Sequence, residues 1–122
     1  MVSVKVLNMG KVSSMLKGKS KKVIALADSA INESGLFMES EVVASIAGQR
    51  GEPVSVDTGR FKNSVTTDNS QKLQSKISTN VSYGPGLEYG TSKMNARHHF
   101  GNSAQRNKKK VTGFIQDKVN QI

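Results

Sequence analysis

The sequence predicts a fold of the α+β class, with a short strand, a long N-terminal helix, a β-hairpin and a second helix that ends the chain. Apolar residues recur at spacings of three and four between residues 11 and 47, which is typical of one face of an amphipathic helix. Residues 64–67 and 73–82 have strand-like patterns, and a second helical stripe follows them. A chain of 122 residues has the size of one domain, so we expect a single domain over residues 1–122.

The first two elements are expected to be a short strand and the long helix. Val2, Val4 and Val6 alternate with polar residues, as in a strand. The helix over residues 11–47, at 1.5 Å per residue, would be on the order of 55 Å long. Gly18 and Gly35 each cost about 1 kcal/mol relative to Ala inside a helix, so either is a candidate for a bend or an end.

Residues 48–55, GQRGEPVS, interrupt the helical pattern. Their two glycines and Pro53 disfavour a helix or a central strand, so we expect a mobile loop. After this loop, Asp57 and Thr58 are good N-cap residues for a short helical turn that runs through Phe61.

The next segment has the pattern of a β-hairpin. Residues 64–67 are expected to be its first strand, residues 68–71 have turn chemistry, and residues 73–82 are expected to be its second strand. An exposed edge of this hairpin is a candidate site for a strand from a neighbouring chain, with residues 2–6 as the donor. One face of the second strand carries Leu73, Ser75, Ile77, Thr79 and Val81.

Residues 83–100, YGPGLEYGTSKMNARHHF, are rich in glycine and aromatic residues and nearly free of acidic residues. The glycines and the proline favour a shaped loop over a regular helix or strand. Tyr83, Tyr89 and Phe100, together with Leu87, are expected to anchor this loop in the core.

A final helix is expected over residues 104–119. Asn102 or Ser103 is the expected N-cap, and Gly113 weakens the helix. The apolar stripe of this helix consists of Val111, Phe114, Ile115, Val119 and Ile122.

The net charge of +9 is the strongest compositional signal. Eighteen Lys and Arg face nine Asp and Glu, which favours nucleic acid, anionic lipid or an acidic protein surface as a partner. Lysines that only keep an aliphatic protein soluble would produce the same excess. Five lysines lie in the first third of the long helix, where they oppose the macrodipole, and either a partner or a solvated face explains them. They are Lys11, Lys17, Lys19, Lys21 and Lys22.

The composition also excludes several classes of protein. The chain has no Cys, which excludes disulfides, thiolate catalysis and thiolate metal sites. No apolar run approaches 18 residues, and the N-terminus lacks the apolar core of a signal peptide. We therefore expect a protein that is made and folded in a cytoplasm and does not enter a membrane.

The sequence shows no catalytic constellation, and we expect a non-enzymatic protein without a cofactor or a small-molecule substrate. His98 and His99 are the only histidines, and adjacent residues point to different sides of a helix or strand, which disfavours a shared metal. Acid–base use of either histidine would need an orienting carboxylate, for which Asp57 and Glu88 are the candidates. The run GPGLEYG is one residue too long for a dinucleotide-binding glycine pattern.

Binding of nucleic acid is an alternative from another functional class. Arg97, Arg106 and Lys108–Lys110 lie near several aromatic residues in the sequence. Cations and aromatic rings together can follow a nucleic acid backbone and stack on bases, although no known binding module is recognisable in this chain.

Two segments of the chain together form a distinctive pattern. The first is VDTGRFKNSV at residues 56–65, and the second is YGPGLEYGT at residues 83–91, which continues into SKMNAR at residues 92–97. In this order and spacing they resemble the signature of the HK97 gp10-like family of tailed-phage morphogenesis proteins, and nearly the whole chain follows the family's order. It departs at Phe61, where Leu is more usual, and at residues 98–100, where His-His-Phe replaces a proline and an aromatic residue.

The resemblance implies an α+β fold in which a long N-terminal helix packs across a small antiparallel β-sheet, with a C-terminal helix. It also implies a structural role in the virion of a tailed bacteriophage. Members of this family are regarded as neck or tail-completion proteins that form rings between the head connector and the tail and leave a channel for DNA. We therefore expect a hexameric or dodecameric ring that contacts the head connector or adaptor and the tail terminator or tail tube, with DNA in the lumen as a further candidate contact. A tail terminator that caps the tail tube is the nearest alternative.

The resemblance also marks candidate interface or motif residues. Asp57 and Thr58 are expected to have a local capping role, and Arg60 is expected to be exposed and to pair across a subunit interface. Glu88 and Arg97 are expected to form an ion pair within their loop or to contact another subunit. The full set is Asp57, Thr58, Gly59, Arg60, Phe61, Ser64, Tyr83, Glu88, Tyr89, Gly90, Thr91, Met94 and Arg97.

Overall fold

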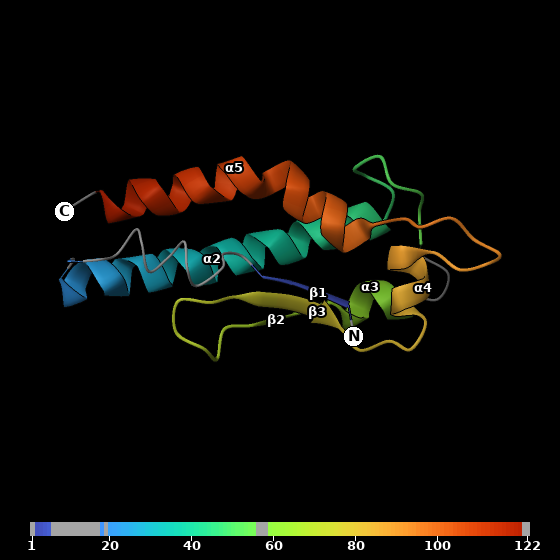
Figure 1. The fold of residues 1–122 in the computed structure, drawn as a ribbon, viewed down its shortest axis with the longest axis horizontal. Coiled ribbons are helices and arrows are strands. Elements are labelled where there is room, and N and C mark those ends of the chain that lie inside the picture. Colours follow the sequence, from blue (N-terminus) through green and yellow to red (C-terminus); the bar gives the residue numbers. More distant parts are fainter. Residues whose placement is uncertain (1, 6–17, 19, 56–58, 121–122) are drawn as a thin grey trace.

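The computed structural model describes residues 2–5, 18, 20–55 and 59–120. Two long helices and a small sheet make up most of this part of the chain, as Figure 1 shows. The elements in chain order are β1 (Val2–Lys5), α2 (Lys21–Ile46), α3 (Arg60–Ser64), β2 (Thr66–Asp68), β3 (Lys76–Thr79), α4 (Gly84–Tyr89) and α5 (His99–Val119). Within the described residues, no helix combines the length and the apolar character needed to cross a membrane.

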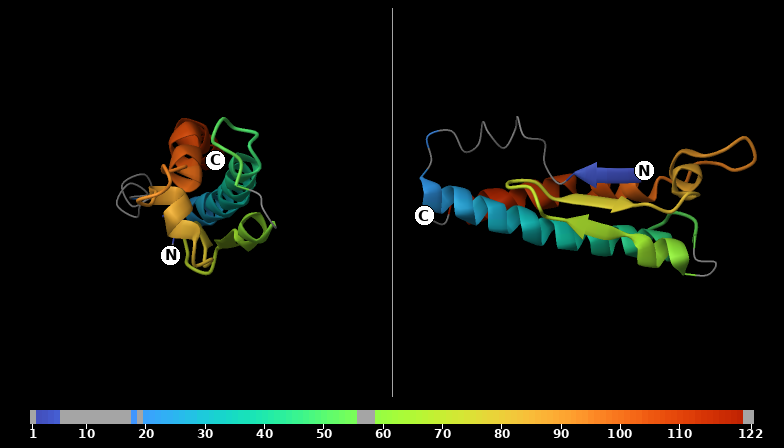
Figure 2. Two further views of the ribbon diagram at one scale, coloured as in Figure 1. Left: turned by 90° about the vertical axis from the view of Figure 1, so that its right-hand side faces the viewer. Right: turned by 90° about the horizontal axis from the view of Figure 1, so that it is seen from below.

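The two long helices lie side by side and run in opposite directions, and the sheet packs against them (Figures 1 and 2). The sheet has the order β1-β3-β2, and both strand pairs are antiparallel. α2 lies across β2 and β3, whereas α5 contacts α2 and β1. The predicted α+β fold, with its long helix across a small antiparallel sheet and its C-terminal helix, is therefore confirmed.

The core between these layers is almost entirely aliphatic. Phe61 and Phe100 are its fully buried aromatic side chains among the described residues, at 2% and 1% exposure. The remaining core side chains come mostly from both long helices and from β1 and β3, and Val65 and Val81 add to them from the connecting segments. They include Ala27, Ala30, Ile31, Met38, Val42, Ile46, Ile77, Val111, Ile115 and Val119.

α2 begins later than the apolar pattern predicts. Its N-cap is Ser20, whose hydroxyl accepts a hydrogen bond from the Val23 N–H at 3.4 Å. Gly18 has a φ of +76°, a left-handed conformation outside the helix, so the predicted helix from residue 11 is wrong at its N-terminal end. The helix has 26 residues and a length of about 39 Å, and residues 11–17 lie outside the described part of the chain.

Gly35 lies inside α2 and does not end the helix. It occupies the point where the helix crosses the sheet. An added Cβ on Gly35 would lie 1.7 Å from the Ser75 Oγ, 2.7 Å from the Ser75 Cβ and 3.1 Å from the Thr67 Cγ2. Because real Cβ atoms do not approach other atoms this closely, the missing side chain allows the helix and the sheet to meet.

The hairpin is confirmed, but its strands are shorter than predicted. Ser64 ends α3 and is not part of a strand, whereas Asp68, expected in the turn, belongs to β2. Leu73 has a φ of +59°, which interrupts the predicted second strand near its start. The predicted face is nevertheless correct, because Ser75, Ile77, Thr79 and Val81 are all buried.

β1 pairs with β3 of its own chain, with Val4 opposite Ile77. β1 therefore covers the edge of the β2–β3 hairpin of its own chain. The expectation that residues 2–6 are donated to a neighbouring chain is wrong for Val2–Lys5. Val6, the last residue of the predicted strand, lies outside the described residues.

Gly35→Ala tests the close approach of α2 to the sheet. In an open helix this change would stabilise the protein by about 1 kcal/mol, but overpacking against Ser75 should instead lower the free energy of unfolding by about 1–3 kcal/mol. Gly113→Ala is the matched control, since nothing lies within 4 Å of its added Cβ, and it should stabilise α5. Urea denaturation of both variants measures the difference. Equal stabilisation by the two substitutions would contradict the packing argument.

Candidate functional site

The two motif segments of the sequence meet at one end of the molecule, where both α3 and α4 lie (Figure 1). We call this region the motif end; it comprises loop 48–55, α3, α4 and residues 90–101. Phe61 lies at its centre, with its ring centroid 6.1 Å from that of Tyr83 and 6.0 Å from that of His99. An added Cβ on Gly84 would lie 3.2 Å from the Thr79 Cγ2, so a small residue at this position lets α4 approach the end of β3.

Ser64 attaches the first motif to the sheet. Its hydroxyl donates a hydrogen bond to the Phe61 carbonyl at 2.6 Å, and its oxygen lies 2.5 Å from the Thr79 Oγ1. Gly59 is the N-cap of α3 with a φ of +79°, and Arg60 is exposed at the start of this helix. Asp57 and Thr58, the predicted caps, lie outside the described residues.

The segment predicted to be a shaped loop contains a helix, α4. Pro85 occupies its first turn, where a missing N–H costs no hydrogen bond, and Gly90 ends it with a φ of +85°. An added Cβ on Gly90 would lie only 2.9 Å from the Ala96 N, because the chain folds back at this point. Thr91 and Met94 close the return by backbone hydrogen bonds of 2.9 and 3.3 Å.

Glu88 caps the N-terminus of α5 from a different helix. Its carboxylate is 3% exposed and accepts hydrogen bonds from the backbone N–H groups of Phe100 and Gly101, both at 2.9 Å. A negative charge here also meets the positive end of the α5 dipole. The predicted ion pair of Glu88 with Arg97 is therefore wrong, since Arg97 donates instead to the Val54 carbonyl at 2.7 Å and to the Ser55 Oγ at 2.8 Å.

α5 begins at His99, five residues before the predicted start at Ala104. His98, the N-cap, has a φ of +52° and makes no capping hydrogen bond with its side chain. Asn102 and Ser103, the predicted caps, lie inside the first turns of the helix, so both cap predictions are wrong. The error has a physical reason: Glu88 supplies the cap, and no local side chain is needed.

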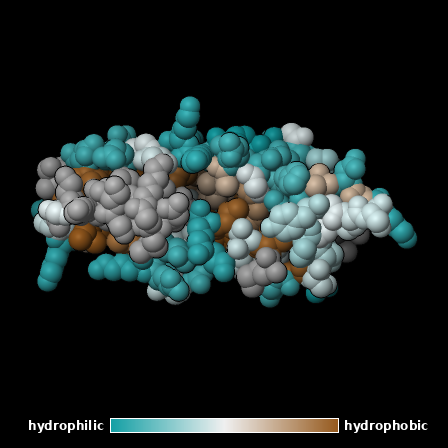
Figure 3. Space-filling model, viewed as in Figure 1, coloured by the Kyte–Doolittle hydropathy of each residue, from teal (hydrophilic) through white to brown (hydrophobic). Residues whose placement is uncertain are grey.

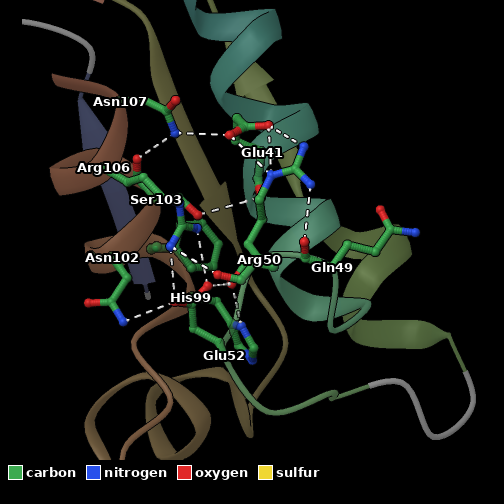
Figure 4. Close-up of polar contacts among 12 residues, drawn as sticks. Glu41, Gln49, Arg50, Glu52, His99, Asn102, Ser103, Arg106 and Asn107 are labelled. Atoms are coloured by element: carbon green, nitrogen blue, oxygen red, sulfur yellow. Dashed lines mark hydrogen bonds and ion pairs between the residues drawn. The ribbon is translucent and has the colours of Figure 1, made fainter. Parts of the chain in front are cut away.

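His99 is fully buried within a continuous chain of hydrogen bonds (Figure 4). The Ser45 hydroxyl donates its single proton to the Glu52 carboxylate at 2.5 Å, so its oxygen accepts from the His99 Nδ1–H at 2.9 Å. The neutral ring then accepts at Nε2 from the Ser55 hydroxyl at 2.7 Å. Arg97 donates to Ser55, which completes the chain of donors from Arg97 to Glu52.

The pKa values agree with this arrangement. Burial lowers the pKa of His99 from 6.5 to about 4, against the opposing charge of Glu52, so the ring is neutral at pH 7. Burial alone would raise the pKa of Glu52, but hydrogen bonds from Arg106, Ser45 and Asn102 lower it to about 2. A histidine with this pKa is a weak base near neutral pH, which favours a structural role over acid–base catalysis. Glu88, predicted as its orienting carboxylate, caps α5 instead.

Loop 48–55 is tied to both long helices by ion pairs (Figure 4). Arg50 contacts the Glu41 carboxylate of α2 at 2.9 Å, and Arg106 of α5 contacts the Glu52 carboxylate at 3.0 Å. Glu41 also accepts a hydrogen bond from Asn107 at 3.1 Å, and the hydrogen bond from Arg50 is the main cause of its lowered pKa. The predicted loop is therefore present, but these contacts argue against the mobility expected from its glycines.

Sequence reasoning missed this polar network. Glu41 nevertheless carried a signal, because it lies between Met38 and Val42 on the apolar stripe of α2. A carboxylate in a buried stripe requires a partner, and Arg50 and Asn107 provide it. Spacing alone could not identify these two partners.

Three large apolar or aromatic side chains are exposed at the motif end. Tyr89 is 65% exposed, Val54 56% and Tyr83 43%. The prediction that both tyrosines anchor the segment in the core is therefore wrong, whereas it is confirmed for Phe100 at 1% exposure. Leu87 is partly buried against the core. Two exposed tyrosines at one end of the molecule are the kind of side chain that contacts other proteins.

The carboxylates near the motif end are withdrawn from the surface. Glu41 and Glu88 are 9% and 3% exposed, and the side chain of Glu52 is 8% exposed. Each holds its part of the fold by hydrogen bonds, so the charged side chains that the described residues expose here are cations. Among the described residues, no group of three His, Asp or Glu side chains is arranged to hold a metal ion.

Comparison with known proteins identifies no relative of this chain. The chain matches no protein-family model, and no curated protein or solved structure is significantly similar to it.

Glu88→Ala tests the capping contact. The substitution leaves two backbone N–H groups at the start of α5 without an acceptor, so the free energy of unfolding should fall by roughly 2–4 kcal/mol. Glu88→Gln keeps one acceptor oxygen and should lose about half as much. Asp117→Ala is the control: it removes an exposed carboxylate from α5 itself and should change the free energy of unfolding by less than about 0.5 kcal/mol. Similar small effects of all three substitutions would rule out the cap.

The burial of neutral His99 predicts a loss of stability in mild acid. Between pH 6.5 and 4 the unfolded chain binds a proton at this residue and the folded chain does not, so stability falls as the pH falls through this window. Glu52 extends the loss of stability to lower pH, because its pKa in the folded protein is about 2, below the ordinary value of 4.5. Urea midpoints at pH 7, 6 and 5 measure the slope.

His99→Gln should be less stable at pH 7 but should lose the pH dependence between 7 and 5. His98→Asn is the control, since His98 is exposed and Asn tolerates its left-handed backbone. An unchanged slope in His99→Gln would show that another group causes the pH dependence.

Proposed function

We propose that this chain is a structural, non-enzymatic subunit of a tailed-phage virion that forms a homo-oligomeric ring at the neck, between the head connector and the tail. The observation that carries the proposal is the meeting of both family-like motifs around Phe61 at one end of the molecule. The first motif packs against the second through the Phe61 and Tyr83 rings, and the second motif caps α5 through Glu88. Together they build a rigid end rather than a reactive centre.

The shape of this end supports a role in assembly. Gly84 and Gly90 allow close backbone approaches that shape α4 and the return after it, and the two tyrosines project from this base. Binding sites between proteins concentrate their energy in such aromatic anchors. In a ring each contact is heterologous, so this end of one subunit would meet a different face of the next.

The surroundings of His99 support assembly over catalysis. The side chains that could relay a proton, from Ser55 through His99 to Glu52, join loop 48–55 to α2 and α5. The low pKa of His99 opposes its use as a base at neutral pH. The network contains the residue types of a catalytic relay, but its hydrogen bonds hold loop 48–55 against α2 and α5.

The proposal includes partners, location and state. The ring is hexameric or dodecameric, resides at the head–tail interface of the virion, and contacts the connector or adaptor on one face and the tail terminator or tail tube on the other. Its lumen leaves a channel for DNA. Before assembly the chain is monomeric, because ring closure requires the template of a neighbouring ring.

Two alternatives have different consequences. A tail terminator that caps the tail tube would use the same fold and the same ring, and its position in a map of the virion would identify it. A nucleic-acid-binding protein without a role in assembly is favoured by the exposed cations, but it would form no ring with connector proteins.

Tyr89→Ala tests the motif end as the assembly surface. Tyr89 is mostly exposed, so the substitution should leave the melting temperature nearly unchanged while ring formation on the connector falls at least about tenfold, as expected for a hot-spot tyrosine. Leu36→Ala is the control, because Leu36 lies on α2 outside the motif end and is 57% exposed, against 65% for Tyr89. Native mass spectrometry with the connector counts the subunits.

A stable two-fold dimer, alone and with the connector, would contradict the ring. Normal ring formation by Tyr89→Ala, together with loss in Leu36→Ala, would place the assembly surface on α2 instead.

A further inference from the structure

The outward face of α5 carries a compact group of polar and basic side chains, which we call the α5 basic face. Gln105, Arg106, Lys108, Lys109 and Thr112 line a shallow hollow of about 540 Å³. All of these residues except Thr112 are exposed, and the lining contains no acidic and no apolar residue. In the view of Figure 3, the edge of the molecule formed by α5 is largely hydrophilic.

The two lysines of this face are not neutralised within the described part of the chain. Lys108 and Lys109 make no hydrogen bond or ion pair there, whereas Arg106 shares the buried carboxylate of Glu52. Asp117 is the only acidic residue of α5, and it lies eight residues beyond Lys109, about 12 Å along the helix axis. Glu33 of α2 is an exposed carboxylate that lies with Lys110 along a separate hollow between the two long helices, and it does not line this face.

Cations of the motif end extend the field of this face. Lys93 is exposed there and Arg97 is partly exposed, and no carboxylate is exposed among the described residues of that end. Such a one-sided surface concentrates anions near it. The partner of this face is therefore an anion with many charges.

The lining indicates which kind of polyanion fits. Lys, Arg, Gln and Thr are all side chains that contact DNA phosphates, and such contacts need neither an apolar anchor nor base recognition. Protein–protein interfaces, in contrast, are depleted of Lys and rely on buried aromatic or apolar anchors at their centre. The composition of the α5 basic face therefore favours a phosphate backbone over an acidic protein surface.

We infer that the α5 basic face binds the phosphate backbone of duplex DNA without sequence preference. The inference deepens the proposed function, because in a neck ring it assigns α5 as the helix that faces the DNA in the channel. The motif end, with its exposed tyrosines, then remains available for contacts between subunits. Binding of this kind depends strongly on salt, since each phosphate contact releases counterions.

The test uses the full-length chain and a short, fluorescently labelled DNA duplex of mixed sequence. Fluorescence anisotropy over a series of salt concentrations gives the slope of log K against log salt. Lys108→Ala with Lys109→Ala should reduce the magnitude of this slope by about 1.8, which is about 0.9 for each lost phosphate contact. Changing the duplex sequence should leave the affinity unchanged.

Lys21→Ala with Lys22→Ala is the matched control. It removes the same charge from two exposed lysines at the start of α2, and it should leave the slope nearly unchanged. Equal reductions in both double variants would mean that binding follows net charge and not this face, which overturns the inference. Absence of DNA binding at low salt, or preferential binding of polyglutamate over the duplex, would also overturn it.

Measuring ring formation on the same protein samples distinguishes a failure of this inference from a failure of the proposed function. Ring formation with the connector, measured by native mass spectrometry, should be unchanged in Lys108→Ala with Lys109→Ala. If the wild-type chain binds DNA through this face but never forms a ring, the inference stands and the neck function fails. If rings form but neither rings nor single chains bind DNA, the neck function stands and the inference fails.

Discussion

The rest of the structure depends on the close approach of α2 to the sheet on one side and to α5 on the other. Gly35 leaves room for Ser75 of the strand segment beneath it, where a Cβ could not fit. Toward α5, aliphatic side chains of both helices pack together, and Ser103 and Asn107 add hydrogen bonds to Glu41. A chain with few aromatic residues gains stability by bringing its backbones close together.

Burial of three glutamates connects the fold to its surface chemistry. Glu41, Glu52 and Glu88 hold loop 48–55 and the start of α5, and none of them contributes much exposed negative charge. The stabilising contacts therefore also leave an electropositive surface, which the composition alone shows only as a net charge of +9. The motif end with its exposed tyrosines and the separate basic face on α5 are two different surfaces, which suits the proposed subunit that contacts both protein and DNA.

Elements with a strong local pattern were predictable, and elements defined by distant partners were not. The hairpin, its buried face and the stripe of Val111, Ile115 and Val119 follow from periodicity. The positions of α4 and of the start of α5 were missed, because glycine and proline suggested a loop and because the α5 cap is Glu88, 12 residues before Phe100. Tyr89 was misplaced for a related reason: aromatic character does not reveal which side of a short helix faces the core.

The sequence by itself determined the α+β class, the order of the long elements and their apolar faces, because spacings of two and of three to four residues express local backbone geometry. Only the tertiary structure decided which charged groups are buried and which remain exposed. The contacts responsible join Ser45 to His99 and Glu41 to Asn107, 54 and 66 residues apart. A buried charge is stable only when its partners are in place, and chain folding brings such partners together at separations that no local pattern records.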